Sequence, residues 1–180
     1  MVIVLEDLQL LIEKCTLNDR LSQEKLYRRF YPALFLLCKR LLADNRDALE
    51  TLNDGMMKVF KNIGEYKADK GDFFNWAYTV VRNTAIDKIK RLQQPLIKDL
   101  SSVTEIAPDE NPLKTLEGKD IYKLLDALPP ATRAVCGLFY IEKFSIKEIR
   151  EKLAVSEGTI KWHLSESRKR IKPVLEKYYL

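Results

Sequence analysis

"SIKEIREKLAVSEGTIKWHLSESRKR", residues 145–170, decides the fold of the C-terminal part of the chain. Ser145 followed by Glu148 is a capping-box pattern, which predicts that a helix begins there. That helix is short and ends near Leu153. Ser156 is a natural N-cap for a second, longer helix whose outer side is basic. Two helices joined by so short a turn predict a helix-turn-helix.

The second helix buries one face and leaves the other for a partner. Ile160, Leu164, Ile171 and Leu175 recur at helical spacing and mark the buried face. Recognition helices read base edges in the major groove with their N-terminal residues, and cations further along suit phosphates. An ordinary solvated basic face is the alternative for the charges alone. The predicted DNA-contacting residues are Ser156, Glu157, Thr159, Lys161, Trp162, His163, Ser165, Arg168 and Lys169.

His163 is the only histidine of the chain, and it sits beside one of the two tryptophans, Trp162. A general base needs a positioned partner, and the sequence offers no second histidine, phosphate-binding glycine loop or nucleophile elbow. No cysteine or histidine pair has metal-ligand spacing. We therefore predict neither an enzyme nor a metal or cofactor site. Whether Trp162 or His163 meets DNA, or packs at the domain edge, stays open at this point.

Apolar residues at steps of three and four also fill the N-terminal part, and no period-2 strand pattern occurs. Residues 95–118 break this periodicity with prolines and acidic residues, so they form either a solvated connector or an extended arm. The predicted fold is all-α, with helical domains at 1–94 and 119–180 joined by that acidic, proline-containing linker. The predicted N-terminal helices include "QEKLYRRFYPALFLLCKRLL", "DALETLNDGMMKVFKNI" and "FFNWAYTVVRNTAIDKIKRL". The predicted apolar face of the first is Leu26, Phe30, Leu34, Leu37 and Leu41, and that of the second is Leu49, Leu52, Met56, Val59, Phe60 and Ile63.

Charge follows the same division. Residues 1–94 hold 16 basic and 13 acidic side chains (net +3), residues 95–120 hold 3 and 6 (net −3), and residues 121–180 hold 12 and 7 (net +5). No run approaches the roughly 18 apolar residues of a membrane span, and the N-terminus lacks the features of a signal peptide. We expect a cytoplasmic protein without membrane insertion. The three cysteines lie among apolar neighbours and are predicted to be buried free thiols.

The N-terminal part has a second candidate surface, formed by a helix and the loop before it. Asn can read a base edge, cations can hold phosphate, and aromatic rings among cations can stack on unpaired bases. Phe73, Phe74 and Trp76 also suit the helix core, so their role stays open. The candidate residues are Tyr66, Lys67, Lys70, Phe73, Trp76, Arg82, Asn83, Asp87, Lys90 and Arg91.

These segments, in this order, resemble the extracytoplasmic-function (ECF) sigma factors of the sigma-70 family. "FFNWAYTVVRNTAIDKIKR" is similar to the family's region 2 segment, and "LDALPPATRAVCGLFYIEKFSIKEIREKLAVSEGTIKWHLSESRKRI" to its region 4 segment. The resemblance implies a non-enzymatic factor that directs core RNA polymerase to promoters. It implies −10 recognition by the N-terminal surface and −35 recognition by the helix at 156–170.

The resemblance also implies partners: the β′ clamp helices and β flap of the polymerase, promoter DNA, and an anti-sigma factor of the kind the family often has. The clamp-binding helix would be the one at 47–63. The residues implied in polymerase binding are Glu50, Asn53, Asp54, Met57 and Lys58.

Two departures from the family pattern fall in the helix-turn-helix. Arg150 stands where a small Ala is usual, and Ala154 where Gly is usual. A long Arg between close-packed helices must direct its charge outward.

The rival interpretation is a helix-turn-helix regulator that binds DNA without polymerase, but such a protein should carry an α/β or ligand-binding N-terminal domain. A structural helical adaptor would leave both basic surfaces unexplained.

Overall fold

Helices make up every regular element in residues 7–97 and 124–179, which are the residues that this computed structural model describes. The prediction of an all-α protein is therefore confirmed over these ranges. The elements are α1 (Leu8–Thr16), α2 (Arg20–Leu41), α3 (Asn45–Lys61), the 3₁₀ turns η1 (Ile63–Glu65) and η2 (Ala68–Lys70), α4 (Phe73–Ile97), α6 (Pro130–Cys136), the π-helix η3 (Gly137–Ile141), α7 (Ile146–Leu153) and α8 (Glu157–Tyr179).

Aspartates begin the first three helices. The side chain of Asp7 accepts a hydrogen bond from the Gln9 amide at 3.1 Å, and that of Asp19 accepts one from the Ser22 amide at 2.9 Å. Asp44 does the same for α3. Each carboxylate satisfies an amide that has no partner within its helix, and its negative charge suits the positive end of the helix dipole.

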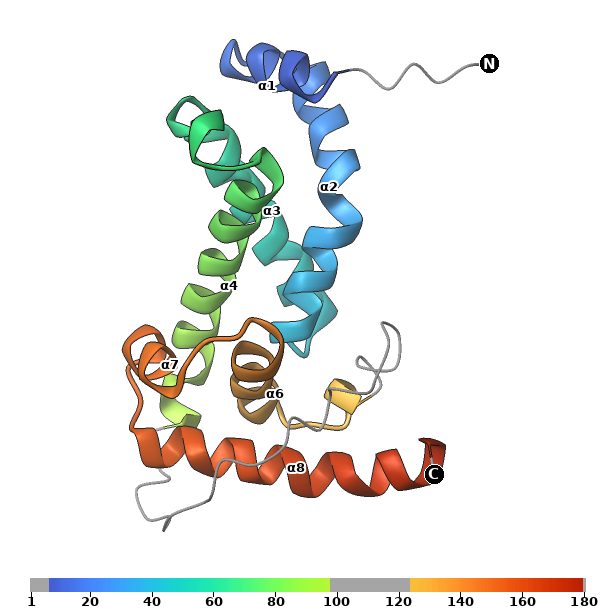
Figure 1. The fold of residues 1–180 in the computed structure, drawn as a ribbon, viewed down its shortest axis with the longest axis vertical. Coiled ribbons are helices and arrows are strands. Elements are labelled where there is room, and N and C mark those ends of the chain that lie inside the picture. Colours follow the sequence, from blue (N-terminus) through green and yellow to red (C-terminus); the bar gives the residue numbers. More distant parts are fainter. Residues whose placement is uncertain (1–6, 98–123, 180) are drawn as a thin grey trace.

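The N-terminal module (residues 7–97) is built from α1 to α4. Helices α2, α3 and α4 run alongside one another and contact in pairs (Figure 1). Their shared core is apolar, and the periodic positions predicted for α2 are all buried. Leu49 differs from its prediction as a core residue, because 40% of it stays exposed on the outer side of α3. Core side chains of this module include Leu26, Leu34, Leu37, Leu41, Leu52, Met56, Val59, Phe73, Ala77, Val81, Ala85 and Ile89.

The C-terminal module (residues 124–179) is smaller. Helices α6 and α7 both pack on α8, which runs across the end of the molecule beneath them (Figure 1). Its core combines apolar side chains with several buried polar ones. The buried polar residues of this module are Thr132, Arg133, Thr159, His163 and Ser167.

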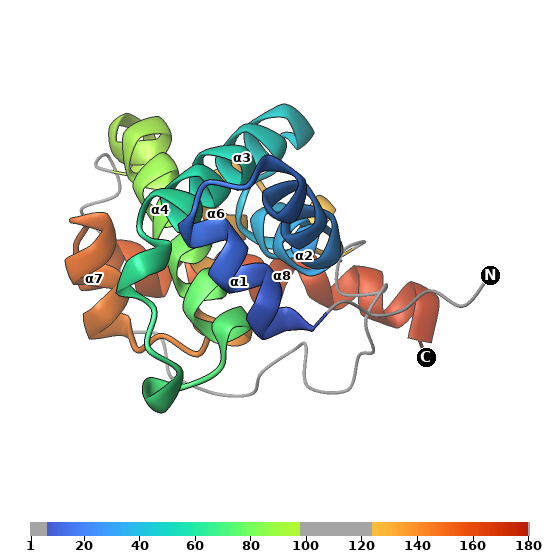
Figure 2. The same cartoon turned by 90° about the horizontal axis from the view of Figure 1, so that it is seen from above.

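The two modules contact each other directly. Helix α6 packs against α2 and α4, and α7 packs against α4. Seen from above, α6 lies between α4 and α2, and α7 lies on the outer side of α4 (Figure 2). The DNA-binding candidates of both modules therefore belong to one packed body rather than to two separated ones.

The three cysteines, Cys15, Cys38 and Cys136, are free and buried, as predicted. Burial raises the pKa of Cys38 and of Cys136 to about 12, which keeps both as unreactive thiols. Within the described ranges, no helix is both long enough and apolar enough to cross a membrane.

Candidate nucleic-acid interface

The helix-turn-helix is formed by α7 and α8, as predicted. Ser145 and Glu148 make the complete capping box, with the Glu148 amide donating to Ser145 Oγ at 3.2 Å and the Ser145 amide donating to Glu148 Oε2 at 2.8 Å. Ser156 begins α8, and its Oγ accepts the Thr159 amide at 3.1 Å. Both helix starts are thus fixed by side chains that the sequence itself supplies.

The turn between the two helices passes through Ala154, whose φ is 56° and ψ 45°. This left-handed conformation is the one in which glycine is favoured, because a Cβ is crowded there. Ala154 stands where the resembled family usually has Gly. It keeps the left-handed turn, and the crowding of its Cβ destabilises the fold at this position.

Arg150 directs its charge outward, as predicted. Its side chain is 46% exposed, and its Nη1 lies 3.4 Å from Glu157 Oε1 across the turn. This contact links α7 to the first turn of α8. Glu157, a predicted DNA-contacting residue, is consequently paired with a cation of its own module.

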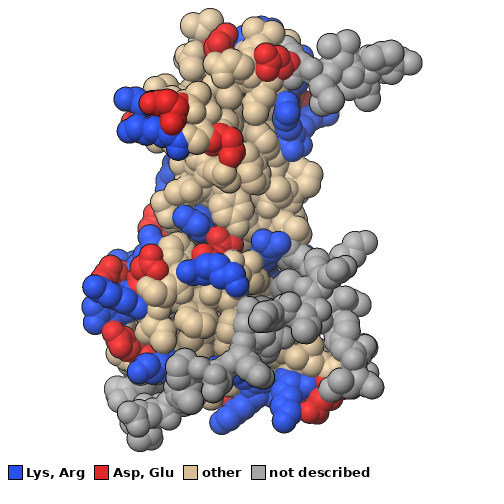
Figure 3. Space-filling view, in the orientation of Figure 1, with Lys and Arg blue, Asp and Glu red and all other residues tan. Residues whose placement is uncertain are grey.

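The structure divides the predicted residues of α8 into an outer and an inner set. Lys169 is exposed, as are Ser156 and Glu157 at the start of the helix, whereas Thr159 and His163 are buried. Lys and Arg side chains gather along the lower edge of the molecule, where α8 lies (Figure 3). Partly exposed positions are Lys161, Trp162, Ser165 and Arg168.

His163 faces the interior of the C-terminal module and is 3% exposed. Its Nδ1 lies 3.0 Å from Thr132 Oγ1 on α6, and the Trp162 ring meets the imidazole edge-on at 4.9 Å. Burial lowers the pKa of His163 to about 4, and the nearby Glu166 carboxylate only partly opposes this. Of the tryptophan-histidine pair, Trp162 is the one that keeps a partly exposed surface.

Thr159 and His163 are therefore corrected as interface candidates. Both occupy the side of α8 that packs on the rest of its module, so neither side chain can reach a ligand in this arrangement. Within residues 7–97 and 124–179, no group of histidine, cysteine or carboxylate side chains is arranged to hold a metal ion.

The aromatic loop of the N-terminal module is ordered around Tyr66. Its hydroxyl donates to the Gly71 carbonyl at 3.0 Å, and its ring meets Phe73 edge-on at 5.1 Å and Trp76 at 5.9 Å. Phe73 is 1% exposed and belongs to the core, which is one of the two roles that the sequence left open for it. Tyr66 of the loop and Trp76 of α4 are partly exposed, and Lys67 and Lys70 of the loop are exposed.

Along α4, the predicted residues share one side of the helix but differ in their contacts. Asn83, Asp87 and Arg91 are exposed, and Lys90 is partly so. Asp87 Oδ2 lies 3.9 Å from Lys58 Nζ on α3. Arg82 is different, because it turns toward the C-terminal module and lies 3.6 Å from Glu142 Oε2.

The five residues implied in polymerase binding, Glu50, Asn53, Asp54, Met57 and Lys58, are all exposed along α3. Met57 is 70% exposed and is the apolar side chain among these five residues. Asn53 Oδ1 accepts a hydrogen bond from the Tyr27 hydroxyl of α2 at 2.7 Å.

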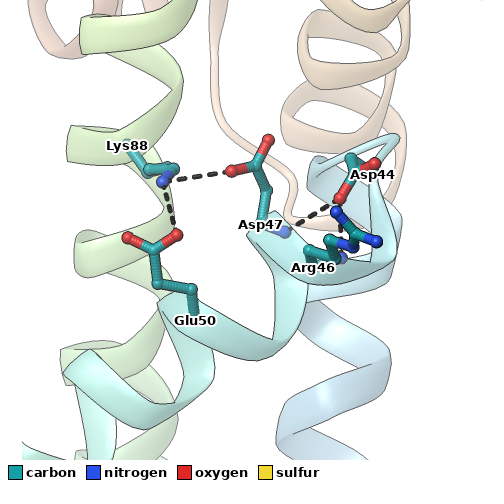
Figure 4. Close-up of polar contacts among 5 residues, drawn as sticks. All are labelled: Asp44, Arg46, Asp47, Glu50 and Lys88. Carbon is teal, nitrogen blue, oxygen red and sulfur yellow. Dashed lines mark hydrogen bonds and ion pairs between the residues drawn. The ribbon is translucent and has the colours of Figure 1, made fainter.

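One residue of this surface was missed by sequence reasoning. Lys88 of α4 reaches Asp47 Oδ1 at 3.1 Å and Glu50 Oε2 at 3.0 Å, so it ties α4 to the beginning of α3 (Figure 4). The hydrogen bonds that Lys88 donates to Glu50 and then to Asp47 raise the pKa of Lys88. Asp44 completes the cluster by accepting the Arg46 and Asp47 amides at 2.7 and 3.1 Å. Glu50 and Lys88 are 38 positions apart, so no local pattern announces the contact.

The fold and these surfaces define a class: an all-helical protein with a helix-turn-helix and a second, separate basic surface. Comparison with known families agrees. The model of Sigma-70 region 2 matches residues 26–94, and that of Sigma-70, region 4 matches residues 118–171. The chain belongs to the sigma-70 family and is an ECF sigma factor, a non-enzymatic factor of transcription initiation.

Individual relatives show the same similarity. The chain is 27% identical to the ECF RNA polymerase sigma factor SigE of Mycolicibacterium smegmatis, over 87% of this chain and 63% of that protein. It is 25% identical to SigM of Mycobacterium tuberculosis, over 88% of this chain and 79% of that one. Among solved structures, the sigma factor RpoE in complex with the anti-sigma factor NepR from Bartonella quintana has 20% identity and a TM-score of 0.46, covering 85% of this chain and 96% of that one.

Proposed function

We propose that this sigma factor binds core RNA polymerase through the exposed side of α3 and brings two DNA-reading surfaces to one promoter. The domains would be residues 1–94 and 119–180, joined by the linker at 95–118, and the factor would act in the cytoplasm. The observation that carries the proposal is the presence of two separate basic surfaces on one chain. A third face, on α3, is mostly polar with one exposed apolar side chain and belongs to neither basic surface.

The −10 surface would consist of the loop and α4. Tyr66 and Trp76 offer partly exposed rings on which unpaired bases can stack, and Lys67 and Lys70 are exposed on the same loop as Tyr66. Exposed side chains further along α4 would then contact the backbone and a base edge. These are Asn83, Asp87, Lys90 and Arg91.

The −35 surface would be the outer side of α8. Lys161 and Ser165, both partly exposed, would contact base edges in the major groove, since Lys donates to guanine acceptors and Ser to either base type. Arg168 and Lys169 lie further along the helix, where phosphate contacts would add affinity but little sequence information. Partly exposed Trp162 would supply apolar contact. Thr159 and His163 are left out because both are buried.

The apolar part of the polymerase-binding face would be Met57, whose 70% exposure makes it the natural anchor of that surface. Glu50, Asn53, Asp54 and Lys58 surround it with polar groups. Such an arrangement of one apolar anchor with a polar rim is typical of protein interfaces.

The test is transcription in vitro with core RNA polymerase and promoter-containing DNA. We expect promoter-specific transcripts with the wild-type chain, and loss of both transcription and core capture with Met57→Glu. The matched control is Leu17→Glu, since Leu17 is also highly exposed, at 81%, but lies on the turn after α1. Lys161→Ala should weaken binding to −35 duplex by about fivefold or more while leaving core capture unchanged.

Two results would contradict the proposal. Absence of promoter-specific transcripts together with no capture of the core enzyme would leave only a polymerase-independent DNA-binding protein. Equal loss of core capture with Met57→Glu and Leu17→Glu would show that α3 is not the docking face.

A further inference from the structure

Two buried polar pairs join α6 to α8, the helix proposed above to read the −35 element. The first pair is Thr132 and His163, whose Oγ1 and Nδ1 atoms lie 3.0 Å apart. The second is Cys136 and Ser167. Burial raises the pKa of the Cys136 thiol to about 12, and a hydrogen bond with Ser167 partly opposes this. None of these four side chains is more than 3% exposed.

The two pairs lie one turn apart on both helices. Thr132 and Cys136 are four positions apart on α6, and His163 and Ser167 are four positions apart on α8. Residues with this spacing share one face of a helix, so the pairs form a short row along the contact. One pair alone would let α8 pivot about it, whereas two pairs a turn apart fix both the rotation of α8 and its position along α6.

Apolar packing alone would fix that rotation less sharply. Ile160 and Leu164, also on the inner side of α8, are 0% and 5% exposed. Their burial is favourable in any orientation that keeps them out of water, because the hydrophobic effect is not directional. A hydrogen bond depends on distance and angle, and breaking one inside a protein leaves a polar group unpaired. The polar pairs therefore select one orientation among those that apolar burial allows.

The rotation of α8 decides where its outer side points. Lys161, Trp162 and Ser165, the residues proposed to meet base edges, lie within two positions of His163. Successive residues are about 100° apart around a helix, so the direction of His163 fixes theirs. Trp162 is also held directly, because its ring meets the imidazole at 4.9 Å and at an interplanar angle of 81°.

A small rotation of α8 would change base contacts more than phosphate contacts. An α-helix with its side chains has a radius of about 5–6 Å, so a rotation of about 20° moves the outer tips by about 2 Å. Hydrogen bonds tolerate a change of only about 0.5 Å. Phosphate contacts come from long cationic side chains and carry no direct sequence information. Discrimination between sequences should therefore depend on the rotation more than total affinity does.

We propose that His163 is a positioning residue for −35 recognition. Together with Ser167 it fixes the rotation of α8 against α6, and so decides which base edges Lys161, Trp162 and Ser165 reach. His163 acts through these residues and does not itself contact DNA. The consequence for DNA rests on the proposed function, whereas the rotation depends only on the contacts between α6 and α8.

The first test needs no DNA and uses the full-length chain. Thr132→Val keeps the shape of the side chain and removes the hydroxyl, which leaves the buried imidazole without its partner. The imidazole should then turn toward water and carry Trp162 outward. In a Trp76→Phe background, the quenching of Trp162 fluorescence by acrylamide should rise about twofold, because an unpaired buried polar group favours exposure.

The second test measures discrimination between sequences. The full-length wild-type chain selects its preferred duplex from a pool with a randomised central segment, and its affinity is then compared with that for single base-pair variants. Thr132→Val should lower this ratio about fivefold, within the range that one lost base contact gives, and leave binding to unrelated duplex unchanged. Thr132→Ser keeps the hydroxyl and should keep the wild-type ratio.

A double variant separates positioning from stability. When both partners are apolar, as in Thr132→Val with His163→Leu, no buried polar group is left unpaired and stability should return toward that of the wild type. The directional contact is still absent, so discrimination should stay low. Recovery of discrimination together with stability would show a merely structural role and overturn the proposal.

Thr51→Val is the matched control. Thr51 is 1% exposed in the N-terminal module, and its Oγ1 has no hydrogen-bond partner among the described residues. It should behave as wild type in both tests, and an equal loss of discrimination there would also overturn the proposal.

Ser167→Ala supplies a second variant in case Thr132→Val fails to fold, which circular dichroism would show. It removes the partner of Cys136 and should shift quenching and discrimination in the same direction by less. Unchanged quenching and unchanged discrimination in the folded variants would contradict the positioning role. A wild-type chain that selects no sequence would refute −35 reading by α8, while the quenching measurement would still decide whether the polar pairs hold the helix.

Discussion

The two modules reach a stable fold by different means. In the N-terminal module, three long helices bury an apolar core, and only Ser22, Thr51 and Thr84 are buried polar side chains in residues 7–92. The smaller C-terminal module buries five polar side chains. One of them, Arg133, is bonded to the backbone of the other module. The N-terminal module is therefore stabilised mainly by burial of apolar side chains. The C-terminal module also depends on hydrogen bonds between buried polar groups and on its contact with the N-terminal module.

This difference fits what each module must do. A dry core tolerates no rearrangement without a large loss of free energy, so the N-terminal module is suited to act as a rigid platform. Buried polar groups cost free energy whenever their partners separate. The C-terminal module should therefore respond to pH and to undocking. The single tryptophan in each module, Trp76 and Trp162, allows the two to be followed separately by fluorescence.

The largest effect should come from the N-terminal core. Leu52 is 0% exposed between α3 and its neighbours, so Leu52→Ala should lower the free energy of unfolding by about 3 kcal/mol through lost burial and a cavity. Urea denaturation followed at Trp76 in a Trp162→Phe background measures this. Leu49→Ala, at a 40% exposed position one turn away, should change stability by less than about 0.5 kcal/mol. Equal effects at both positions would contradict the proposed dry core.

The next effect should be confined to the C-terminal module and arise from pH. The pKa of His163 is about 4 in the fold against about 6.5 for an unperturbed histidine, so the unfolded state binds the proton more readily between these values. Stability is fully present above pH 6.5 and is lost as the pH falls toward 4. Between pH 7.5 and 5.0 the loss should be about 2 kcal/mol.

Denaturation followed at Trp162 in a Trp76→Phe background, at the two pH values, checks this. His163→Gln cannot be protonated in that range, so it should remove about 2 kcal/mol of the pH dependence and leave that of other groups. If His163→Gln kept the full dependence, the histidine would not be the group responsible.

The smallest effect should be a gain in stability. Ala154 adopts a left-handed conformation, so Ala154→Gly should stabilise the C-terminal module by about 0.5–1 kcal/mol. The free energy gained by relieving Cβ crowding in the fold is larger than the free energy lost because glycine makes the unfolded chain more flexible. The same substitution at Ala33, an exposed position inside α2, should destabilise the N-terminal module by about 1 kcal/mol. Denaturation at Trp162 and Trp76, respectively, measures the two. A loss of stability with Ala154→Gly would contradict the strain at the turn.

Sequence reasoning located the helices because their signals are local. The cap at Ser156 and the capping box at Ser145 and Glu148 were predicted and are present, since each joins residues three positions apart. The outward direction of Arg150 followed from its length and charge. The borders of helix faces were predicted less well: Leu49 is outside the core and Thr159 is inside it. Phe73 and His163, whose roles the sequence left open, are also inside the core. A border position can be buried or exposed depending on which neighbour packs over it, and periodicity alone does not specify that neighbour.

The sequence by itself determined an all-helical chain, the helix-turn-helix, the free buried thiols and membership of the sigma-70 family, because these depend on local spacing and composition. Only the tertiary structure decided that His163 turns toward Thr132, that Lys88 joins Asp47 and Glu50, and that Glu142 pairs with Arg82. These pairs join residues 31 to 60 positions apart. Such contacts form because packed helices bring distant side chains together, and their free energy appears only after the chain has folded.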